Sequence, residues 1–374
     1  MSFMGLLTLV PQVAAGYNKN MSRLKYLFPL LLAMGLPLHA QVPGKIATSI
    51  ERGISQTQIA VERSATAAKS VFRAYPQGRE DRHALSGFVF KTNYYGREEI
   101  FGVIATHSVP LTYKDPLGAY ITARITVNGR EKDIPGEMVQ IASPMMLDMA
   151  LIKFNPEDEP LLTPLTLAEQ DPAVEDKLQV TGFAQQELTF VLNKPLLMST
   201  LTSLRFPLNK TWRDVAGMCG SPVLNEDGKV VGMFTGTGEE SSSLSHTGFA
   251  TKTSYLHTLV AAYHSGTEKA TFPLMLGEHK IVDLHINEFV SNVYLQDEEG
   301  HRILRQNVHY KFPYNTLMQH LPRARYITLN IFTSPSWVGY GASEAVLSDV
   351  YHVTYDLKEK KMIDSGLGMK LISQ

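Results

Sequence analysis

The chain reads Gly217-Met218-Cys219-Gly220-Ser221-Pro222-Val223 around the only cysteine among its 374 residues. A single thiol cannot form an internal disulfide, so a framework built from several cysteines is excluded. Glycines beside a nucleophile let the backbone turn so that nearby amides point inward. Taken alone, Cys219 has a simpler interpretation as a small buried hydrophobic residue, and its context decides between the two.

The residues that follow predict a hairpin. Val223 and Leu224 lead into Asp227-Gly228, and Val230 to Met233 resume an apolar run. Gly228 supplies the positive φ that such a turn needs.

The segment around Cys219 resembles the Gly-x-Ser-Gly-(Gly/Ser)-Pro-Val motif of chymotrypsin-like peptidases, with cysteine in place of serine. It is also similar to the Gly-x-Cys-Gly motif of chymotrypsin-like cysteine proteases of positive-strand RNA viruses. The resemblance implies that Cys219 is the nucleophile and that the N–H groups of Gly217 and Cys219 form the oxyanion hole. Gly220 would give room behind the thiol.

Two upstream segments match the same family in the same order. Ile104 to Ser108 resembles an apolar strand ending in Ala-x-His, which implies that His107 is the catalytic histidine. Asp148 to Lys153 resembles Asp-(Ile/Leu)-Ala-Leu-(Ile/Leu)-Lys, which implies that Asp148 is the catalytic aspartate. His107 lies 41 residues before Asp148, and Asp148 lies 71 residues before Cys219, gaps that suit a compact member.

The resemblance implies a mainly β fold, a chymotrypsin-like double six-stranded β-barrel over residues 79–265. The barrel is expected to begin near Ser86, with Gly182 at the crossover between its halves. Thr247 to Leu256 is similar to the family's last strand and the start of its closing helix, which is expected from Ser254 to about His264.

Residues 41–78 are expected to form a helical segment before the barrel. Apolar residues recur there at helical spacing, and Pro76 and Gly78 end the pattern; the apolar residues are Ile46, Ile50, Ile54, Val61, Ala65, Ala68 and Phe72. We interpret the segment as a helix packed on the outside of the barrel, with a regulatory or coiled-coil arm as the alternative.

Residues 266–374 predict a smaller antiparallel β domain. Alternation from Val282 to Ile286 and from Tyr351 to Leu357 indicates strands, and Asp297 to Gly300 indicates a hairpin turn. The segment lacks the arrangement of a PDZ module. Its expected role is to bind a protein partner, and a purely structural cap is the alternative. Its histidines show no metal-ligand spacing, and we expect neither a metal nor a cofactor.

The first 40 residues are expected to be a leader and signal peptide. Met21 to Lys25 is basic, Tyr26 to Leu36 is apolar and uncharged, and Leu38-His39-Ala40 resembles a cleavage site before Gln41. Translation is expected to begin at Met21, and the mature protein to be periplasmic or secreted in a bacterium, with no stable membrane span. An uncleaved membrane anchor is the alternative.

Charge gives no reason to expect a nucleic-acid partner. Lysine and arginine number 35 and aspartate and glutamate 36, so the formal charge is −1. A protein or peptide substrate fits this balance better than a polyanion.

The resemblance also implies a primary specificity pocket. Its hydroxyls and cation would favour an acidic or amide side chain, and the alternative is that Arg213 points to solvent beside Asp214. By alignment to the family, the pocket residues are Arg213, Thr235, Gly236, Thr237, His246 and Gly248.

The sequence favours an exported endopeptidase with a Cys-His-Asp triad and a covalent acyl-thioester intermediate. The first alternative is a pseudoprotease whose barrel binds peptides. A redox sensor is less attractive because no resolving cysteine is present. Ser221 is unsuited as the nucleophile because it lies beyond the glycine pattern and precedes Pro222.

Overall fold

The computed structural model describes residues 66–373, apart from 77–84, 109–116, 144–145, 186, 201, 209, 211–212, 241–243, 267–269, 309–311 and 334–348. The chain divides into two compact units, residues 1–59 and 60–374, and all described residues belong to the second. The predicted signal peptide and most of the predicted N-terminal helix lie outside the described residues. None of the helices described here has the length and apolarity needed to cross a membrane.

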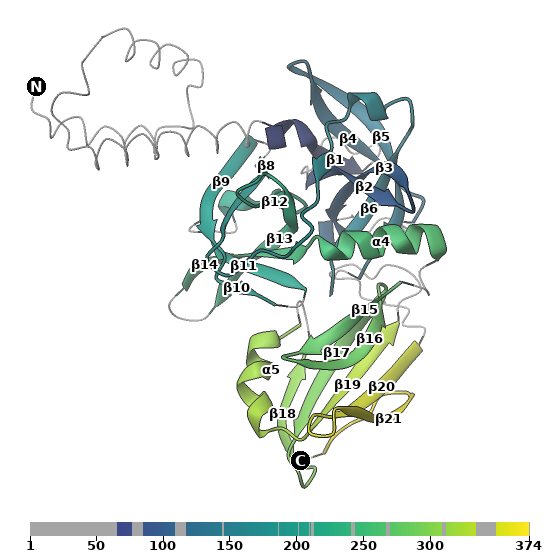
Figure 1. Ribbon diagram of the computed structural model, residues 1–374, viewed down its shortest axis with the longest axis vertical. Helices are drawn as coiled ribbons and strands as arrows, with labels where there is room; N and C mark the ends of the chain where they lie inside the picture. The colour runs from purple at the N-terminus through teal and green to yellow at the C-terminus, as the bar shows by residue number, and fades with distance from the viewer. Residues whose placement is uncertain are drawn as a thin grey trace, which may run out of the picture. The chain divides into compact units, whose positions relative to one another are not determined.

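The fold is mainly β, as predicted, and its first six strands close into an antiparallel barrel (Figure 1). Hydrogen bonding runs in the order β1-β4-β5-β6-β3-β2, and pairing of β1 with β2 completes the circle. Phe72, Ile104 and Phe154 are among the buried side chains that fill it. The strands are β1 (Val71–Pro76), β2 (Leu85–Tyr94), β3 (Arg97–Ala105), β4 (Tyr120–Val127), β5 (Arg130–Ile141) and β6 (Met149–Phe154).

The start of this barrel differs from the sequence prediction. The apolar spacing predicts a helix through Phe72 and a barrel that begins near Ser86, but residues 66–70 are helical and Val71–Pro76 is strand β1. Every residue of β1 except Arg73 is buried, because the strand pairs with both β2 and β4. A strand that is buried at nearly every position lacks the alternation of apolar and polar residues that marks a half-buried strand. The apolar residues of β1 therefore look like a continuation of the helical spacing in the sequence before it.

A second sheet follows, with the order β10-β11-β14-β13-β12-β8-β9 and its own apolar core. The predicted hairpin is present, with Gly228 at φ +75° between β12 and β13. The short strand β7 (Leu165–Thr166) comes before the second sheet in the sequence and belongs to the first sheet, where it pairs with β2. The sheet strands are β8 (Lys177–Ala184), β9 (Glu187–Pro195), β10 (Met198–Ser199), β11 (Ser203–Pro207), β12 (Pro222–Leu224), β13 (Val230–Glu240) and β14 (Leu244–Lys252).

Helix α4 (Ser254–Ser265) closes the peptidase-like region where the sequence predicts it. Its buried residues, among them Leu256 and Leu259, pack in a core that also contains Phe101 of the first barrel and Phe272 of the C-terminal region. The C-terminal region is therefore packed against the barrel through a shared apolar core.

The C-terminal region is antiparallel β structure, as expected. A hairpin of β15 (Thr271–Leu276) and β16 (His279–His285) precedes a five-stranded sheet in the order β18-β17-β19-β20-β21 (Figure 1). The predicted turn at Asp297 to Gly300 joins β17 to β18. The remaining elements are β17 (Glu288–Gln296), β18 (Arg302–Asn307), α5 (Tyr314–His320), β19 (Tyr326–Thr333), β20 (Asp349–Asp356) and β21 (Lys361–Leu367).

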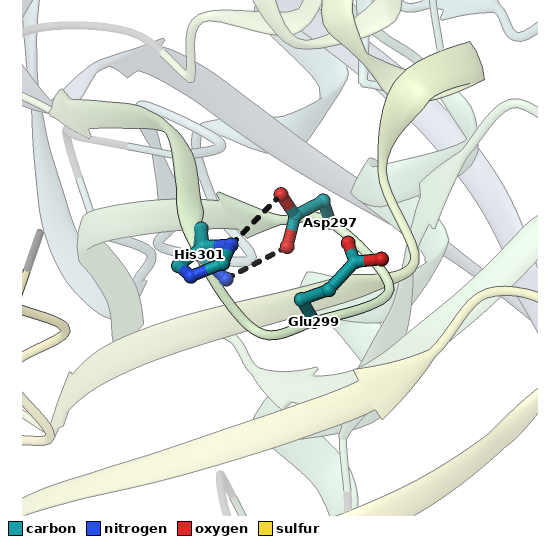
Figure 2. Close-up of side chains that lie close together, drawn as sticks. All are labelled: Asp297, Glu299 and His301. Atoms are coloured by element: carbon teal, nitrogen blue, oxygen red, sulfur yellow. Dashed lines mark hydrogen bonds and ion pairs between the residues drawn. The ribbon is translucent and has the colours of Figure 1, made fainter.

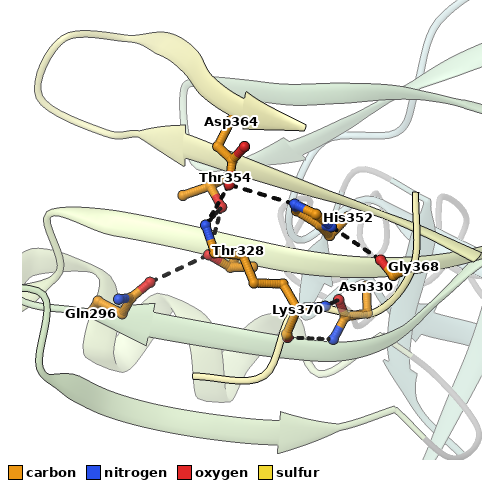
Figure 3. A network of polar contacts seen from close by, with 8 residues as sticks. All are labelled: Gln296, Thr328, Asn330, His352, Thr354, Asp364, Gly368 and Lys370. Carbon is orange, nitrogen blue, oxygen red and sulfur yellow. Dashed lines mark hydrogen bonds and ion pairs between the residues drawn. The ribbon is translucent and has the colours of Figure 1, made fainter. Parts of the chain in front are cut away.

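The last residues fold back onto this sheet (Figure 3). The fully buried Asn330 side chain accepts a hydrogen bond from the Lys370 N–H (2.9 Å) and donates one to the Lys370 carbonyl (3.1 Å). His352 Nδ1 lies 3.0 Å from the Gly368 carbonyl, and Arg302 donates to the Ile372 carbonyl. The Lys370 ammonium also contacts Thr354 and Asp364, so both the backbone and one side chain of the tail bind the sheet.

Candidate active site

Strand pairing brings His107 and Asp148 together at one end of the first barrel. His107 lies in the short 3₁₀ turn Thr106–Ser108 directly after β3, and Asp148 directly precedes β6. β3 and β6 are antiparallel, with Ala105 opposite Met149. The residues just after the end of β3 therefore lie beside the residue just before the start of β6. The Thr106 N–H donates to the Asp148 carbonyl at 3.2 Å.

The Asp148 carboxylate binds His107 with both oxygens. Oδ2 lies 2.6 Å from ring Nδ1, and Oδ1 accepts the backbone N–H of His107 at 2.8 Å. The side chain of Asp148 is 4% exposed and that of His107 19%. This arrangement fixes the orientation of the imidazole and leaves it partly open to solvent.

Cys219 completes the cluster from the second sheet. It follows the 3₁₀ turn Arg213–Val215 and precedes β12, and it is half-buried. Its side chain lies close enough to the His107 ring to contribute to raising the pKa of that ring. The three residues singled out by the sequence motifs therefore lie in one cluster, and only the contacts between His107 and Asp148 are hydrogen bonds of defined length.

The charge state of His107 follows from these neighbours. Burial lowers the pKa of the ring, but the Asp148 charge, the hydrogen bond to Asp148 and the contact with Cys219 together raise it from 6.5 to about 10. His107 is therefore an imidazolium at neutral pH.

The backbone around Cys219 has the turn that its glycines predict. Gly217 and Gly220 have φ of +96° and +93°. The Met218 and Gly220 amides donate to the Val215 and Phe234 carbonyls at 2.9 and 2.7 Å. Among the residues that the structure describes, no group accepts a hydrogen bond from the Gly217 or Cys219 N–H.

A neighbouring loop orients the Gly217 amide. The Ala216 carbonyl accepts the N–H of Gln185 at 2.8 Å, and the Gln185 side chain donates to the Arg213 carbonyl at 2.9 Å. The C=O and N–H of a trans peptide point in opposite directions. The Gly217 N–H therefore points away from Gln185.

Ser86 joins the first barrel to the nucleophile loop, a role that the motifs did not reveal. Its N–H and its hydroxyl both donate to the Gly217 carbonyl, at 2.9 and 2.8 Å, and the hydroxyl accepts the Phe183 N–H at 2.8 Å. A side chain at Gly220 would place its Cβ 1.9 Å from the Ser86 carbonyl. The two halves thus touch backbone to backbone beside Cys219. The sequence feature that could have indicated this role is the hydroxyl residue Ser86 itself, which precedes Gly87 at the start of an apolar strand.

The residues proposed for the specificity pocket do not share one environment. Thr235 is buried and lines a cavity together with Asp148, Arg205 and Phe249. Arg213 is exposed on its 3₁₀ turn and not enclosed at the base of a pocket.

The other pocket residues lie on the paired strands β13 and β14. Gly236 and Thr237 are half-buried on β13, and Thr237 pairs with Gly248 of β14. A Cβ at Gly248 would lie 2.7 Å from the buried ring of Phe206, so one side of this strand is filled. His246 lies on β14, and its side chain is outside the described part. The pocket assignment stays a prediction.

Asp297, Glu299 and His301 offer ligand atoms within 4.8 Å of one another in the turn between β17 and β18 (Figure 2). Asp297 accepts the His301 N–H at 2.7 Å and lies 3.4 Å from its ring, and Glu299 and His301 are exposed. These contacts close a hairpin, so we assign no metal to the cluster.

Comparison with known proteins places the site within a recognised domain. The trypsin-like peptidase domain family matches residues 85–233, which include His107, Asp148 and Cys219. No curated protein matches the chain. The match supports a chymotrypsin-like protease, and hence a peptidase that hydrolyses its substrate.

Solved structures resemble about half of the chain. The structure of Deg5 is 17% identical, with a TM-score of 0.42, over 55% of this chain and 94% of that one. An inactive form of the Rv3671c protease is 15% identical, with a TM-score of 0.39, over 55% of this chain and 93% of that one. A mutant of Rv3671c from M. tuberculosis H37Rv, also inactive, is 15% identical, with a TM-score of 0.36, over 54% and 90% of the two chains.

Proposed function

We propose that the chain is an exported endopeptidase that cleaves protein or peptide substrates with a Cys219-His107-Asp148 triad. The observation that carries the proposal is the position of the His107 ring, which hydrogen-bonds Asp148 at 2.6 Å and also contacts the Cys219 side chain. A buried cysteine with only a packing role has no need of a charged imidazole beside it.

In the first half of the reaction the Cys219 thiolate attacks the scissile carbonyl carbon. The C=O π electrons move to the oxygen, and the N–H groups of Gly217 and Cys219 stabilise that oxyanion, each donor contributing roughly 3 kcal/mol. Collapse of this intermediate breaks the C–N bond. His107, protonated up to pH about 10, donates its proton to the departing amine. The products are a free amine and an acyl-thioester on Cys219.

In the second half water hydrolyses the thioester. His107, now neutral, accepts a proton from water as the water oxygen bonds to the acyl carbon. Collapse breaks the C–S bond, releases the carboxylic acid and restores the thiolate beside the imidazolium. Asp148 holds the ring in one tautomer throughout and does not take the proton.

Alkylation of Cys219 tests the activated pair directly. The rate of iodoacetamide labelling at pH 6 is measured for the wild type and for His107→Ala, with Cys219→Ala as the unlabelled control. We expect labelling to fall by about tenfold or more in His107→Ala, because an ordinary thiol with a pKa near 8.5 is almost fully protonated at pH 6. Equal, slow labelling of both proteins would show that the barrel is a pseudoprotease that binds peptides.

Peptide cleavage is the second readout. We expect Cys219→Ala to abolish turnover of a peptide library, and Cys219→Ser to keep a small fraction. Full activity in Cys219→Ala would refute the mechanism. Cleavage after acidic or amide side chains is the expected preference, and cleavage after lysine or arginine would contradict it.

Export is a proposal from the sequence of residues 21–40. Expression of the full chain in a bacterium, followed by cell fractionation and N-terminal sequencing, tests it. The expected mature terminus is Gln41. An uncleaved chain in the cytoplasm would contradict export.

A further inference from the structure

The loop before Asp148 is organised around one carbonyl group. The Ser143 carbonyl accepts the N–H groups of Met146 and Leu147 at 3.1 Å and that of Asp148 at 2.9 Å. The Ala142 N–H donates to the Met149 carbonyl at 2.8 Å and closes the base of the loop. The position of the Ser143 peptide therefore determines where the backbone of Asp148 lies.

Asp148 needs this support because its backbone has φ +56°. Few residues other than glycine adopt this left-handed conformation, although aspartate tolerates it better than most. Its N–H is bound by Ser143 and its carbonyl by Thr106, and its carboxylate is bound to His107. Loss of one of these contacts would let the backbone relax and move the carboxylate away from the imidazole.

The Ser143 N–H is itself bound by the C-terminal domain. It donates to the carbonyl of Ile286 at 2.8 Å, in the turn that joins β16 to β17. Ile286 is fully buried and Ser143 is 8% exposed. Ala142, Leu147 and Ile286 belong to one apolar core, so the hydrogen bond lies in a dry environment where its loss is costly.

A buried carboxylate shapes the turn that presents Ile286. Glu288 is 4% exposed, and it accepts the His285 N–H at 2.8 Å and the Thr333 hydroxyl at 3.3 Å. It also hydrogen-bonds the Tyr351 side chain. A carboxylate with these partners holds residues 285–288 in one conformation, and that conformation aims the Ile286 carbonyl at Ser143.

We propose that the C-terminal β domain is a positioning element of the active site. Glu288 fixes the turn, the Ile286 carbonyl fixes Ser143, and Ser143 fixes Asp148 against His107. Ser143, Ile286 and Glu288 are all buried, so in this proposal they act through Asp148. The inference rests on the proposed function, because it assumes that Asp148 serves the reaction.

Two variants of the full chain each change a different contact in the series from Glu288 to Asp148. Ser143→Pro removes the N–H that binds Ile286, and Glu288→Gln removes the charge that shapes the turn. Ile331→Ala is the matched control. Ile331 is fully buried in β19 of the same sheet, and its loss destabilises the domain without altering the turn. If Ser143→Pro does not fold, Glu288→Gln carries the test.

The readouts are kcat, KM and the pH profile of iodoacetamide labelling at Cys219. We expect both variants to lower kcat by about fivefold or more, because a remote change that misplaces a catalytic group can cost up to about 100-fold in rate. KM should change less than kcat, and the labelling profile should shift toward that of Asp148→Asn. Ile331→Ala should lower the melting temperature but keep the wild-type labelling profile.

The results separate two kinds of failure. If Asp148→Asn shifts the labelling profile but both Ser143→Pro and Glu288→Gln retain the wild-type profile, the coupling is wrong and the triad stands. The coupling is also wrong if Ile331→Ala shifts the profile as much as they do, because general loss of stability then explains the effect. If Asp148→Asn itself changes neither labelling nor turnover, the proposed function fails.

Discussion

Asp148 holds His107 at two points, the backbone N–H at 2.8 Å and ring Nδ1 at 2.6 Å. The backbone contact fixes where the residue lies, and the ring contact fixes how the imidazole is turned. One carboxylate therefore controls both the position and the orientation of the proposed proton carrier.

Asp148→Asn tests the charge without removing the side chain. An amide can still accept the His107 N–H, but it lacks the negative charge and can bind the wrong tautomer of the ring. We expect kcat to fall by about 10²- to 10⁴-fold while measurable turnover remains. Steady-state kinetics on one peptide substrate gives the answer, and wild-type turnover would exclude a role for Asp148.

The pKa of His107 predicts how stability depends on pH. Because the folded-state pKa is raised from 6.5 to about 10, folding binds a proton more tightly. This contribution is fully present below pH 6.5 and is lost as the pH rises through 10. Urea unfolding of Cys219→Ala, in which no thiol titrates, should show this loss at a lower pH, because Cys219 is itself among the causes that raise the pKa of His107. Adding Asp148→Asn should flatten the curve, and parallel curves for the two proteins would contradict the assignment.

Ser86→Ala tests the link between the barrel and the nucleophile loop. The change removes a buried hydroxyl that donates to Gly217 and accepts from Phe183, so the free energy of unfolding should fall by about 1 to 3 kcal/mol. We expect kcat to fall by about 10- to 100-fold because the Gly217 donor loosens. Ser70→Ala is the control, since Ser70 is equally buried but has only a 3.5 Å contact with Thr66. A similar loss of kcat in both variants would show that Ser86 has no special role.

Asn330→Ala should release the C-terminal tail. It removes both hydrogen bonds to the Lys370 backbone, and we expect a loss of about 1 to 3 kcal/mol of unfolding free energy. Hydrogen exchange of the Lys370 amide should become fast, while that of β19 amides stays slow. Asn292→Ala on β17 removes an amide whose contact is with its neighbour Ser291, and it should leave the tail protected. Unchanged protection of Lys370 in Asn330→Ala would mean that other contacts hold the tail.

The site could be predicted where short motifs specify local geometry. The glycines at 217 and 220 predict a turn of the backbone, and both have the positive φ that glycine adopts readily. His107 and Asp148 each sit at the end of an apolar strand, so antiparallel pairing alone brings them together. The hairpin at Gly228 and helix α4 follow from equally local signals.

What the sequence did not reveal depends on long-range contacts. Strand β1 is buried on both faces and continues a helical spacing, so its pattern favours the wrong structure. Ser143 and Ile286 are joined by a backbone hydrogen bond, and a backbone contact leaves no trace in residue type. Thr235 was assigned to the specificity pocket by alignment to the family, and the cavity that it shares with Asp148 and Arg205 could not be read from the sequence.

The contact between Ser86 and Gly217 has a consequence for timing during synthesis. During synthesis, His107 and Asp148 are added to the chain before Cys219, and the turn at Ile286 is added last. The Gly217 carbonyl can be bound by Ser86 only when the two halves have folded against each other. A chain still being synthesised therefore acquires this contact and its sulfur together, after more than half of its residues have been joined.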